Sequence, residues 1–265
     1  MTYQKILLEV SGAVAVVSLN DPSTMNAAGV DTIVELADAF GRVAAGVEGA
    51  RAVVLTGIGR GFCSGANLSG GGPAARQAQG GASAGSSLET HYNPFVTLLR
   101  DFPLPIVTAV NGAAAGVGCS LALMGDMILA GESAYFLQAF RRIGLVPDGG
   151  STYLLPRMIG RARAMEMALL GERLSAAKAL EWGLINRVVA DGDLLTEARS
   201  MAEELARGPA SLGQIRKLMW RSLDAAWADQ LADEAKTQDI AGRSSDFAEG
   251  VRAFLEKRQA QFTGR

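Results

Sequence analysis

The sequence predicts an α/β protein, because short apolar runs typical of buried strands alternate with segments of helical spacing over residues 1–193. From Leu194 onward the pattern is almost purely helical. A chain of 265 residues is long enough for one main domain with an appendage. We therefore expect a core that contains strands over residues 1–193 and a helical region over residues 194–265.

The first elements follow from alternating hydrophobicity and turn residues. Ile6 to Val10 and Val14 to Leu19 flank a Ser-Gly pair and indicate a β-hairpin. Asp31 is expected to cap a helix with one apolar side, formed by Ile33, Leu36, Phe40 and Val43. The run from Ala52 to Thr56 is typical of a strand that is buried on both faces.

The stretch from residue 106 to residue 152 carries two features that suggest chemistry. Gly116-Val117-Gly118 lies where the apolar strand Ile106–Val110 has given way to a helix-like run that begins at Ser120. Glycines allow another molecule to approach the backbone closely, and free N–H groups at the start of a helix favour developing negative charge. This run is therefore a candidate anion-stabilising site.

The second feature is Asp148, which lies between a proline and two glycines in a loop with apolar flanks. A carboxyl group in apolar surroundings tends toward a raised pKa, so it could act as a base near neutral pH. The alternative is that an aspartate before glycine only forms a turn. The spacing alone leaves both interpretations open.

The C-terminal part is predicted from helical stripes and caps. Ala162, Met165 and Leu169 form one apolar stripe in a helix that ends at Gly171, and Ser175 caps a short helix that follows. Further helices are expected over residues 194–206, 211–227, 229–240 and 246–261. The last of these would start with Asp246 and Glu249 as a capping pair and place Phe247, Val251 and Phe254 on one side.

Composition excludes several classes of protein. A net charge of -2 lacks the basic excess of a nucleic-acid-binding groove, and no run of 18 apolar residues indicates a membrane span. The N-terminus lacks the pattern of a secretory signal, so we expect a cytoplasmic protein. Cys63 and Cys119 are expected to be packing residues, and one histidine without a Cys-x-x-Cys pair predicts no metal site.

Seven short motifs, in order, carry a likeness to a known family. They are Asn20-x-Pro22 with Asn26-Ala27, Gly61 to Leu68, Val110 to Gly118, Ala134-Tyr135-Phe136, Gly144 to Gly150, Gly183-Leu184-Ile185, and Glu249 to Arg258. With them the chain resembles the enoyl-CoA hydratase/isomerase (crotonase) superfamily nearly end to end. The resemblance implies a spiral core of ββα turns, a C-terminal helical trimerisation region, and a homotrimer or a dimer of trimers.

The resemblance also implies a substrate and its contacts. The substrate would be an acyl-CoA thioester, so coenzyme A belongs to the substrate and no separate cofactor is expected. The backbone N–H groups of Ala66 and Val117 would form an oxyanion hole for the thioester carbonyl. Substrate contacts are expected from Gly65, Asn67, Leu68, Gly116, Phe136, Phe140 and Leu145, and from Phe254 and Lys257 of a neighbouring subunit. Asn67 stands where the family usually has aspartate.

Departures from the family pattern point to the reaction. Hydratases of the family carry two glutamates, and the matching positions here are Ser120 and Phe140, neither of which titrates near neutral pH. Asp148 remains as acid and base, which resembles the isomerase branch, including the ring-epoxide isomerases of phenylacetyl-CoA degradation. The alternatives are a hydratase or thioester hydrolase that uses Asp148 alone, and a non-catalytic acyl-CoA-binding protein.

Two segments have further interpretations within the family. Residues 69–87 hold no aliphatic side chain larger than alanine, so we expect a flexible insertion or a lid that orders when acyl-CoA binds. His91 is the single histidine. Arylacyl-CoA dehalogenases of the superfamily have a histidine in roughly this helix, but a partly exposed helix residue explains His91 equally simply.

Overall fold

The computed structural model describes residues 2–47, 49–67 and 84–265. The strands in this part of the chain are β1 (Ile6–Ser11), β2 (Val14–Leu19), β3 (Ala52–Gly57), β4 (Gly61–Cys63), β5 (Ile106–Val110), β6 (Ala113–Ala115), β7 (Met127–Gly131), β8 (Tyr135–Leu137), β9 (Leu174–Ser175) and β10 (Arg187–Val189). They form a six-stranded sheet in the order β1-β2-β3-β5-β7-β10 and a four-stranded sheet in the order β4-β6-β8-β9. The β1–β2 and β8–β9 pairs are antiparallel and the other pairs are parallel.

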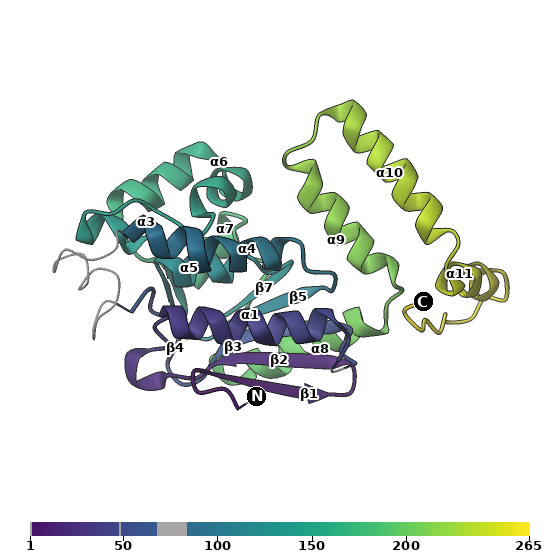
Figure 1. Cartoon of the computed structure of the whole chain (residues 1–265), viewed down its shortest axis with the longest axis horizontal. Helices are drawn as coiled ribbons and strands as arrows, with labels where there is room; N and C mark the ends of the chain where they lie inside the picture. Colours follow the sequence, from purple (N-terminus) through teal and green to yellow (C-terminus); the bar gives the residue numbers. More distant parts are fainter. Residues whose placement is uncertain (1, 48, 68–83) are drawn as a thin grey trace.

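Helices connect and cover the strands (Figure 1). The α-helices of the described residues are α1 (Val30–Ala44), α3 (Ala84–Ser87), α4 (Asn93–Arg100), α5 (Val117–Ala122), α6 (Ser151–Leu170), α7 (Ala176–Glu181), α8 (Leu194–Arg207), α9 (Ser211–Ser222), α10 (Trp227–Ala241) and α11 (Ser245–Leu255). Short helical turns of other types are η1 (Pro22–Thr24), η2 (Leu88–Tyr92), η3 (Ala139–Ile143) and η4 (Asp191–Asp193). None of the described helices combines the length and apolar character that crossing a bilayer requires.

Strands β2, β3 and β5 of the six-stranded sheet are buried on both faces, which explains their continuous apolar runs, whereas the edge strands β1 and β10 are largely exposed or half-buried. Ala15 and Val17 of β2 face the cluster that contains the buried stripe of α1, whereas Val14 and Val16 face the other side. That other side is covered by α8 through Leu194, Ala198, Ala202 and Ala206. The first predicted hairpin and the doubly buried β3 are therefore confirmed.

The helices after α8 are arranged differently. In Figure 1, α9 and α10 form an antiparallel pair that extends away from the sheets, and α11 lies beyond them beside the C-terminus. Many of their apolar side chains are exposed, including Met219, Trp227, Phe254 and Leu255. The division of the chain between residues 193 and 194 stays a prediction.

Two predicted caps are wrong: α1 has no side-chain cap, and α11 is capped by a different residue. Gly29, in an extended conformation, precedes the first residue of α1, and the Asp31 carboxylate accepts from the neighbouring Thr32 N–H at 2.9 Å. At α11 the cap is Ser244, whose hydroxyl accepts from Phe247 N at 3.0 Å. Asp246 instead lies buried and accepts from the backbone amides of Ala210, Thr263 and Gly264.

The predicted stripe of α6 is also wrong. Ala164 and Met167 are buried, whereas Met165 and Leu169 are exposed. Gly160 has a positive φ of 77° and interrupts the helical backbone, and the part of α6 after it packs through Ala164 and Met167, a choice of face that the local apolar pattern does not determine. The end at Gly171, with φ 60°, and the Ser175 cap on Lys178 N are confirmed.

Candidate active site

Two glycines bring separate segments of backbone together at the ends of two parallel strands. Gly65 follows β4 and Gly116 follows β6, and β4 pairs with β6 in parallel, so both segments leave the same edge of the sheet. Gly65 has φ 109°, and a Cβ added there would lie 3.1 Å from the Ala115 carbonyl oxygen and 4.0 Å from Gly116 Cα. Larger residues would separate the two segments, because a side chain at position 65 would fill the contact.

The amides that follow these glycines belong to Ala66 and Val117. Gly116 adopts φ 53° and ψ −127°, which starts α5 at Val117, so the Val117 N–H precedes the first hydrogen bond of the helix, which runs from Cys119 N to the Gly116 carbonyl at 3.0 Å. Ala66 is exposed, whereas Val117 is buried. Both N–H groups thus stand beside one short glycine contact, an arrangement that can stabilise an oxyanion.

Tyr92 is connected to the segment before Ala66 by two consecutive hydrogen bonds. Its side chain is 3% exposed, and its hydroxyl donates to the Ala28 carbonyl at 2.7 Å. The Ala28 N–H donates in turn to the Gly65 carbonyl at 2.8 Å. These two bonds connect η2 to the loop before Ala66. The sequence gives Tyr92 no role in the site, because its hydrogen bond reaches Ala28, 64 positions away, and no local pattern encodes that contact.

The Asp148 loop lies against α5. Gly149 and Gly150 have φ values of 58° and 86°, which favour glycine and turn the chain into α6. A Cβ on Gly149 would lie 2.9 Å from Ser120 Cβ and 3.3 Å from Val117 Cγ2. Val117 and Ser120 are three residues apart on α5 and therefore share a face. The loop that carries Asp148 consequently packs on the face of α5 that bears the Val117 side chain.

The Asp148 carboxyl group is half-buried and incompletely paired. Its Oδ1 atom is buried and has no hydrogen-bond partner among the described residues. Burial raises the pKa of Asp148 to about 6. Burial, and after it the charge of Asp148, raise the pKa of the Tyr92 hydroxyl. A carboxylate in this state can exchange a proton with a ligand near neutral pH.

Aromatic and aliphatic side chains from β8 and η3 complete the surroundings. Phe136 is fully buried in the core, and Phe140 is 6% exposed. The tip of the Phe140 ring lies 3.8 Å from the position of a Cβ on Gly116, so this ring borders the glycine contact. Leu145 is 42% exposed, and its N–H donates to the Phe140 carbonyl at 3.0 Å.

Comparison with known proteins identifies the family. The family model described as enoyl-CoA hydratase/isomerase matches residues 9–265. The chain belongs to this family. It is 45% identical to a probable enoyl-CoA hydratase of Rhodobacter capsulatus, covering 100% of both chains. It is 43% identical to the 1,2-epoxyphenylacetyl-CoA isomerase of Escherichia coli, covering 98% of both.

Solved structures place the fold in the same family. A putative enoyl-CoA hydratase from Streptomyces coelicolor superposes with a TM-score of 0.92 at 32% identity, covering 100% of this chain and 96% of that one. The expected crotonase fold, with strands and helices followed by C-terminal helices, is thereby confirmed. Membership makes the chain an enzyme of the hydratase/isomerase group, and the names of the relatives include both activities.

Some expected site residues lie elsewhere in the chain. Phe254 is 81% exposed on α11, and Lys257 is exposed just beyond it. Figure 1 shows α11 at the opposite end of the molecule from β4 and α5. Within one chain these two residues therefore do not border the glycine contact, and their role toward a neighbouring subunit stays a prediction.

Other expectations fall near the Ala66 segment. Asn67 is half-buried, and its Cβ is 3.7 Å from the position of a Cβ on Gly29. Leu68 and residues 69–83 of the insertion predicted over 69–87 lie outside the described residues, whereas its last four residues form α3. The lid stays a prediction. His91 is partly exposed, with Nδ1 2.7 Å from Thr90 Oγ1. Among the described residues, no cluster of His, Cys, Asp or Glu side chains could hold a metal ion.

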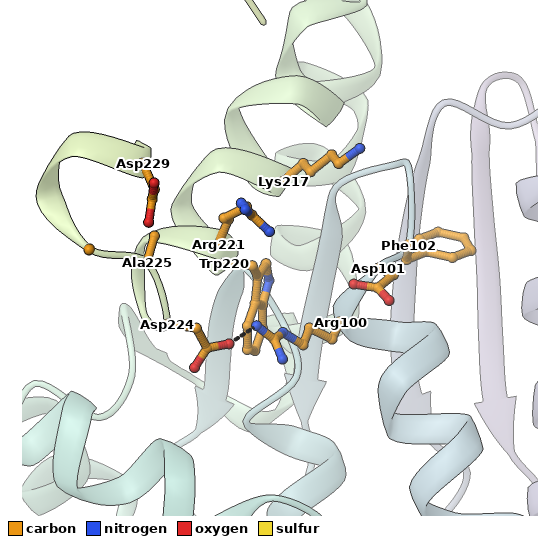
Figure 2. Close-up of a pocket in the computed structure, with 10 residues that line it drawn as sticks. Arg100, Asp101, Phe102, Lys217, Trp220, Arg221, Asp224, Ala225 and Asp229 are labelled. Atoms are coloured by element: carbon orange, nitrogen blue, oxygen red, sulfur yellow. Dashed lines mark hydrogen bonds and ion pairs between the residues drawn. The ribbon is translucent and has the colours of Figure 1, made fainter. Parts of the chain in front are cut away.

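A separate cavity of about 280 Å³ lies where α9 meets the end of α4 (Figure 2). Arg100 forms an ion pair with Asp224 there, and Asp224 also accepts from the Tyr153 hydroxyl at 2.6 Å. Lys217 and Arg221 border the same cavity. Asp101, Asp224 and Asp229 also line it and balance these cations, so the cavity shows no preference for one sign of ligand charge.

Proposed function

We propose that this enzyme is an acyl-CoA isomerase in which Asp148 is the acid and base. The observation that carries the proposal is the Asp148 carboxyl group, whose Oδ1 is buried without a partner and whose pKa is raised to about 6. Its loop packs on the α5 face that also bears Val117. A base beside an oxyanion-stabilising amide suits removal of a proton next to a thioester carbonyl.

The reaction would proceed through an enolate. The Ala66 and Val117 amides would donate to the thioester oxygen, which gains charge as the enolate forms, so they would stabilise the transition state more than the ground state. Asp148 would take a proton from one carbon, and its conjugate acid would return that proton to another carbon on the same face. With a ring-epoxidised arylacetyl thioester, the same carboxyl group would assist ring opening.

The residues around Asp148 support isomerisation over hydration with two carboxylates. Ser120 and Phe140 occupy the positions where hydratases of the family carry glutamates. Both side chains are buried, and the Ser120 hydroxyl already donates to the backbone at 2.8 Å. Neither residue can activate water, so a second acid would have to come from elsewhere.

The substrate class follows from the apolar surroundings. Phe140 and Leu145 would border an aryl or enoyl group, while Phe136 supports the strand behind them. Contacts from Gly65, Asn67, Leu68 and Gly116 would orient the thioester. Phe254 and Lys257 are exposed and thus free to contact the adenine and phosphates of coenzyme A bound to a neighbouring subunit, as a homotrimer or a dimer of trimers would require.

Hydration is the second candidate, because the relative with 45% identity is named a probable enoyl-CoA hydratase. In that case Asp148 alone would activate water for addition to an enoyl thioester. The two reactions differ in their products: hydration adds the mass of water, whereas isomerisation leaves the mass unchanged.

A panel of CoA thioesters analysed by mass spectrometry in ¹⁸O-labelled water tests the proposal. The panel contains ring-epoxidised phenylacetyl-CoA, 3-enoyl-CoA and 2-enoyl-CoA. It also contains phenylacetyl-CoA, which cannot isomerise and therefore reports only exchange of its α-protons with deuterium. We expect a product of unchanged mass, without ¹⁸O, and deuterium uptake next to the carbonyl in D₂O. Incorporation of ¹⁸O would establish the hydratase or hydrolase, and binding without exchange would establish a non-catalytic protein.

A further inference from the structure

Three buried polar side chains form a row beneath the Asp148 loop. They are Ser120 of α5, Gln138 after β8 and Ser151 at the start of α6, each 0% exposed. Ser120 Oγ donates to the Asp148 carbonyl at 2.8 Å and lies 2.6 Å from Ser151 Oγ. Gln138 Nε2 donates to Ser151 Oγ at 3.1 Å.

The hydroxyl protons fix the direction of this row. A serine hydroxyl has one proton, and Ser120 uses it on the Asp148 carbonyl. Ser151 must therefore donate to Ser120, while it accepts from Gln138. The chain runs from the amide of Gln138 to the main chain of Asp148, and hydrogen bonds aligned in one direction strengthen one another.

The row holds the residue that carries the proposed base. The Asp148 carbonyl also accepts from Ser151 N–H at 3.1 Å, so both of its lone pairs are engaged. Gly149 packs on the Cβ of Ser120 and on Val117. One face of α5 thus fixes the Asp148 backbone relative to the Val117 amide.

Stability alone does not account for a glutamine at position 138. Its Oε1 atom is buried and has no partner among the described residues. Leaving such an atom unsatisfied costs about 1 to 3 kcal/mol. The Nε2 group, by contrast, supplies the first donor of the row.

We propose that Ser120, Ser151 and Gln138 are positioning residues that set the Asp148 carboxyl group beside the Val117 amide. This inference rests on the proposed function. It also bears on the serine at position 120, where hydratases of the family carry a glutamate: even a Cβ on Gly149 would lie only 2.9 Å from Ser120 Cβ, so little space separates the loop from this side chain. A glutamate at position 120 would therefore require the Asp148 loop to shift.

The test compares full-length variants with a matched control. Ser120→Ala removes the donor to Asp148, Ser151→Ala removes the middle of the row, and the double variant removes both. Thr56→Val is the control, because the Thr56 hydroxyl is also buried and donates to a backbone carbonyl at 2.8 Å, on Ala109. The measurements are kcat and KM on the active thioester of the panel, and the pKa of Asp148 by ¹³C NMR titration.

We expect Ser120→Ala to lower kcat by about 10- to 100-fold with KM nearly unchanged, since a small displacement of a reacting group has effects of this size. The Asp148 pKa should fall from about 6 toward its ordinary value, because a loosened loop admits water. The double variant should lose little more than either single one, as groups that act as a unit are not additive. Thr56→Val should have the kcat, KM and Asp148 pKa of the wild type.

The outcomes separate this inference from the proposed function. Wild-type kcat and an unchanged Asp148 pKa in Ser120→Ala, with Asp148→Asn inactive, would overturn the positioning role alone. Full activity of Asp148→Asn would overturn both. Should Ser120→Ala not fold, Ser120→Cys keeps the branching of the side chain with a slightly larger atom and weakens the hydrogen bond, and an unchanged Asp148 pKa there would equally overturn the role.

Discussion

Two regions of the molecule each contain an aspartate that is largely shielded from water, and the two carboxyl groups differ in their hydrogen-bond partners. Asp126, before β7, anchors α9: its Oδ2 atom accepts from Arg216 Nε at 2.7 Å and from Ile106 N at 2.8 Å. Arg216 is 5% exposed, and its other N–H groups donate to the carbonyls of Leu99, Arg100 and Phe102 at the end of α4. Asp148 has no such partners on Oδ1.

This comparison separates a structural carboxylate from a reactive one. Burial raises the pKa of both groups, but at Asp126 the positive charge of Arg216 opposes that effect. An ion pair with all its hydrogen bonds made has no capacity left for a ligand. Asp148 retains an unused acceptor and a pKa near neutrality, and these are the properties that proton transfer requires.

The largest expected effect is loss of turnover in Asp148→Asn. The amide keeps the size of the side chain but cannot accept a proton, so kcat should fall by about 10²- to 10⁴-fold. Affinity for the acyl-CoA should stay similar, because the Ala66 and Val117 amides are untouched. Steady-state kinetics and calorimetric titration measure the two quantities.

Asp126→Asn is the matched control for that variant. It makes the same chemical change at a paired carboxylate, so kcat of the folded protein should be retained while stability falls. Equal loss of turnover in both variants would show that the contrast between the two aspartates has no bearing on catalysis.

The next effect is on stability, in Arg216→Met. Methionine fills much of the same volume, but Asp126 is left buried without its charge partner and three carbonyls lose their donor. Breaking a buried pair in this way should lower the free energy of unfolding by about 3 to 5 kcal/mol, measured in urea. Lys178→Ala at the exposed Lys178–Glu181 pair serves as control and should cost under about 1 kcal/mol.

The sequence predicted these two aspartates unequally well. Asp148 was singled out because the proline and glycines around it are a local signal, but only the family resemblance gave it the role of acid and base, which stays a prediction. The β1–β2 hairpin and β3 were found from their periodicity. The pairing of Asp126 with Arg216 joins residues 90 positions apart, and no local pattern encodes it. The row under Asp148 was missed for the same reason, since Ser120, Gln138 and Ser151 meet only when α5, β8 and α6 converge.

A smaller effect is a pH-dependent gain in stability of Asp148→Asn. The folded-state pKa of Asp148, about 6, lies above the ordinary value of 3.8, so the folded protein binds this proton more tightly than the unfolded chain. Wild-type stability should therefore fall as pH rises from about 4 to 6, by about 1 to 2 kcal/mol after allowance for solvent screening. The asparagine of Asp148→Asn does not titrate, so the stability of this variant should not fall over the same pH range.

Denaturation of both proteins at pH 4.5 and pH 7.5 measures this difference. The advantage of Asp148→Asn should be larger at pH 7.5, and turnover of the wild type should rise through pH 6 as the base ionises. An advantage that is the same at both pH values would mean that the carboxyl group has an ordinary pKa and is well solvated.

The smallest effect is expected from Tyr92→Phe, which tests how the Ala66 segment is held. The change removes the hydroxyl that donates to the Ala28 carbonyl and leaves the ring in place. Loss of this buried bond should cost about 1 kcal/mol of stability. Since Ala28 in turn donates to Gly65, kcat should also fall about two- to fivefold through a looser oxyanion hole, whose intact donors contribute several kcal/mol. A stability loss with unchanged kcat would assign Tyr92 to packing alone and leave Asp148 and α5 as the parts of the site that control the rate.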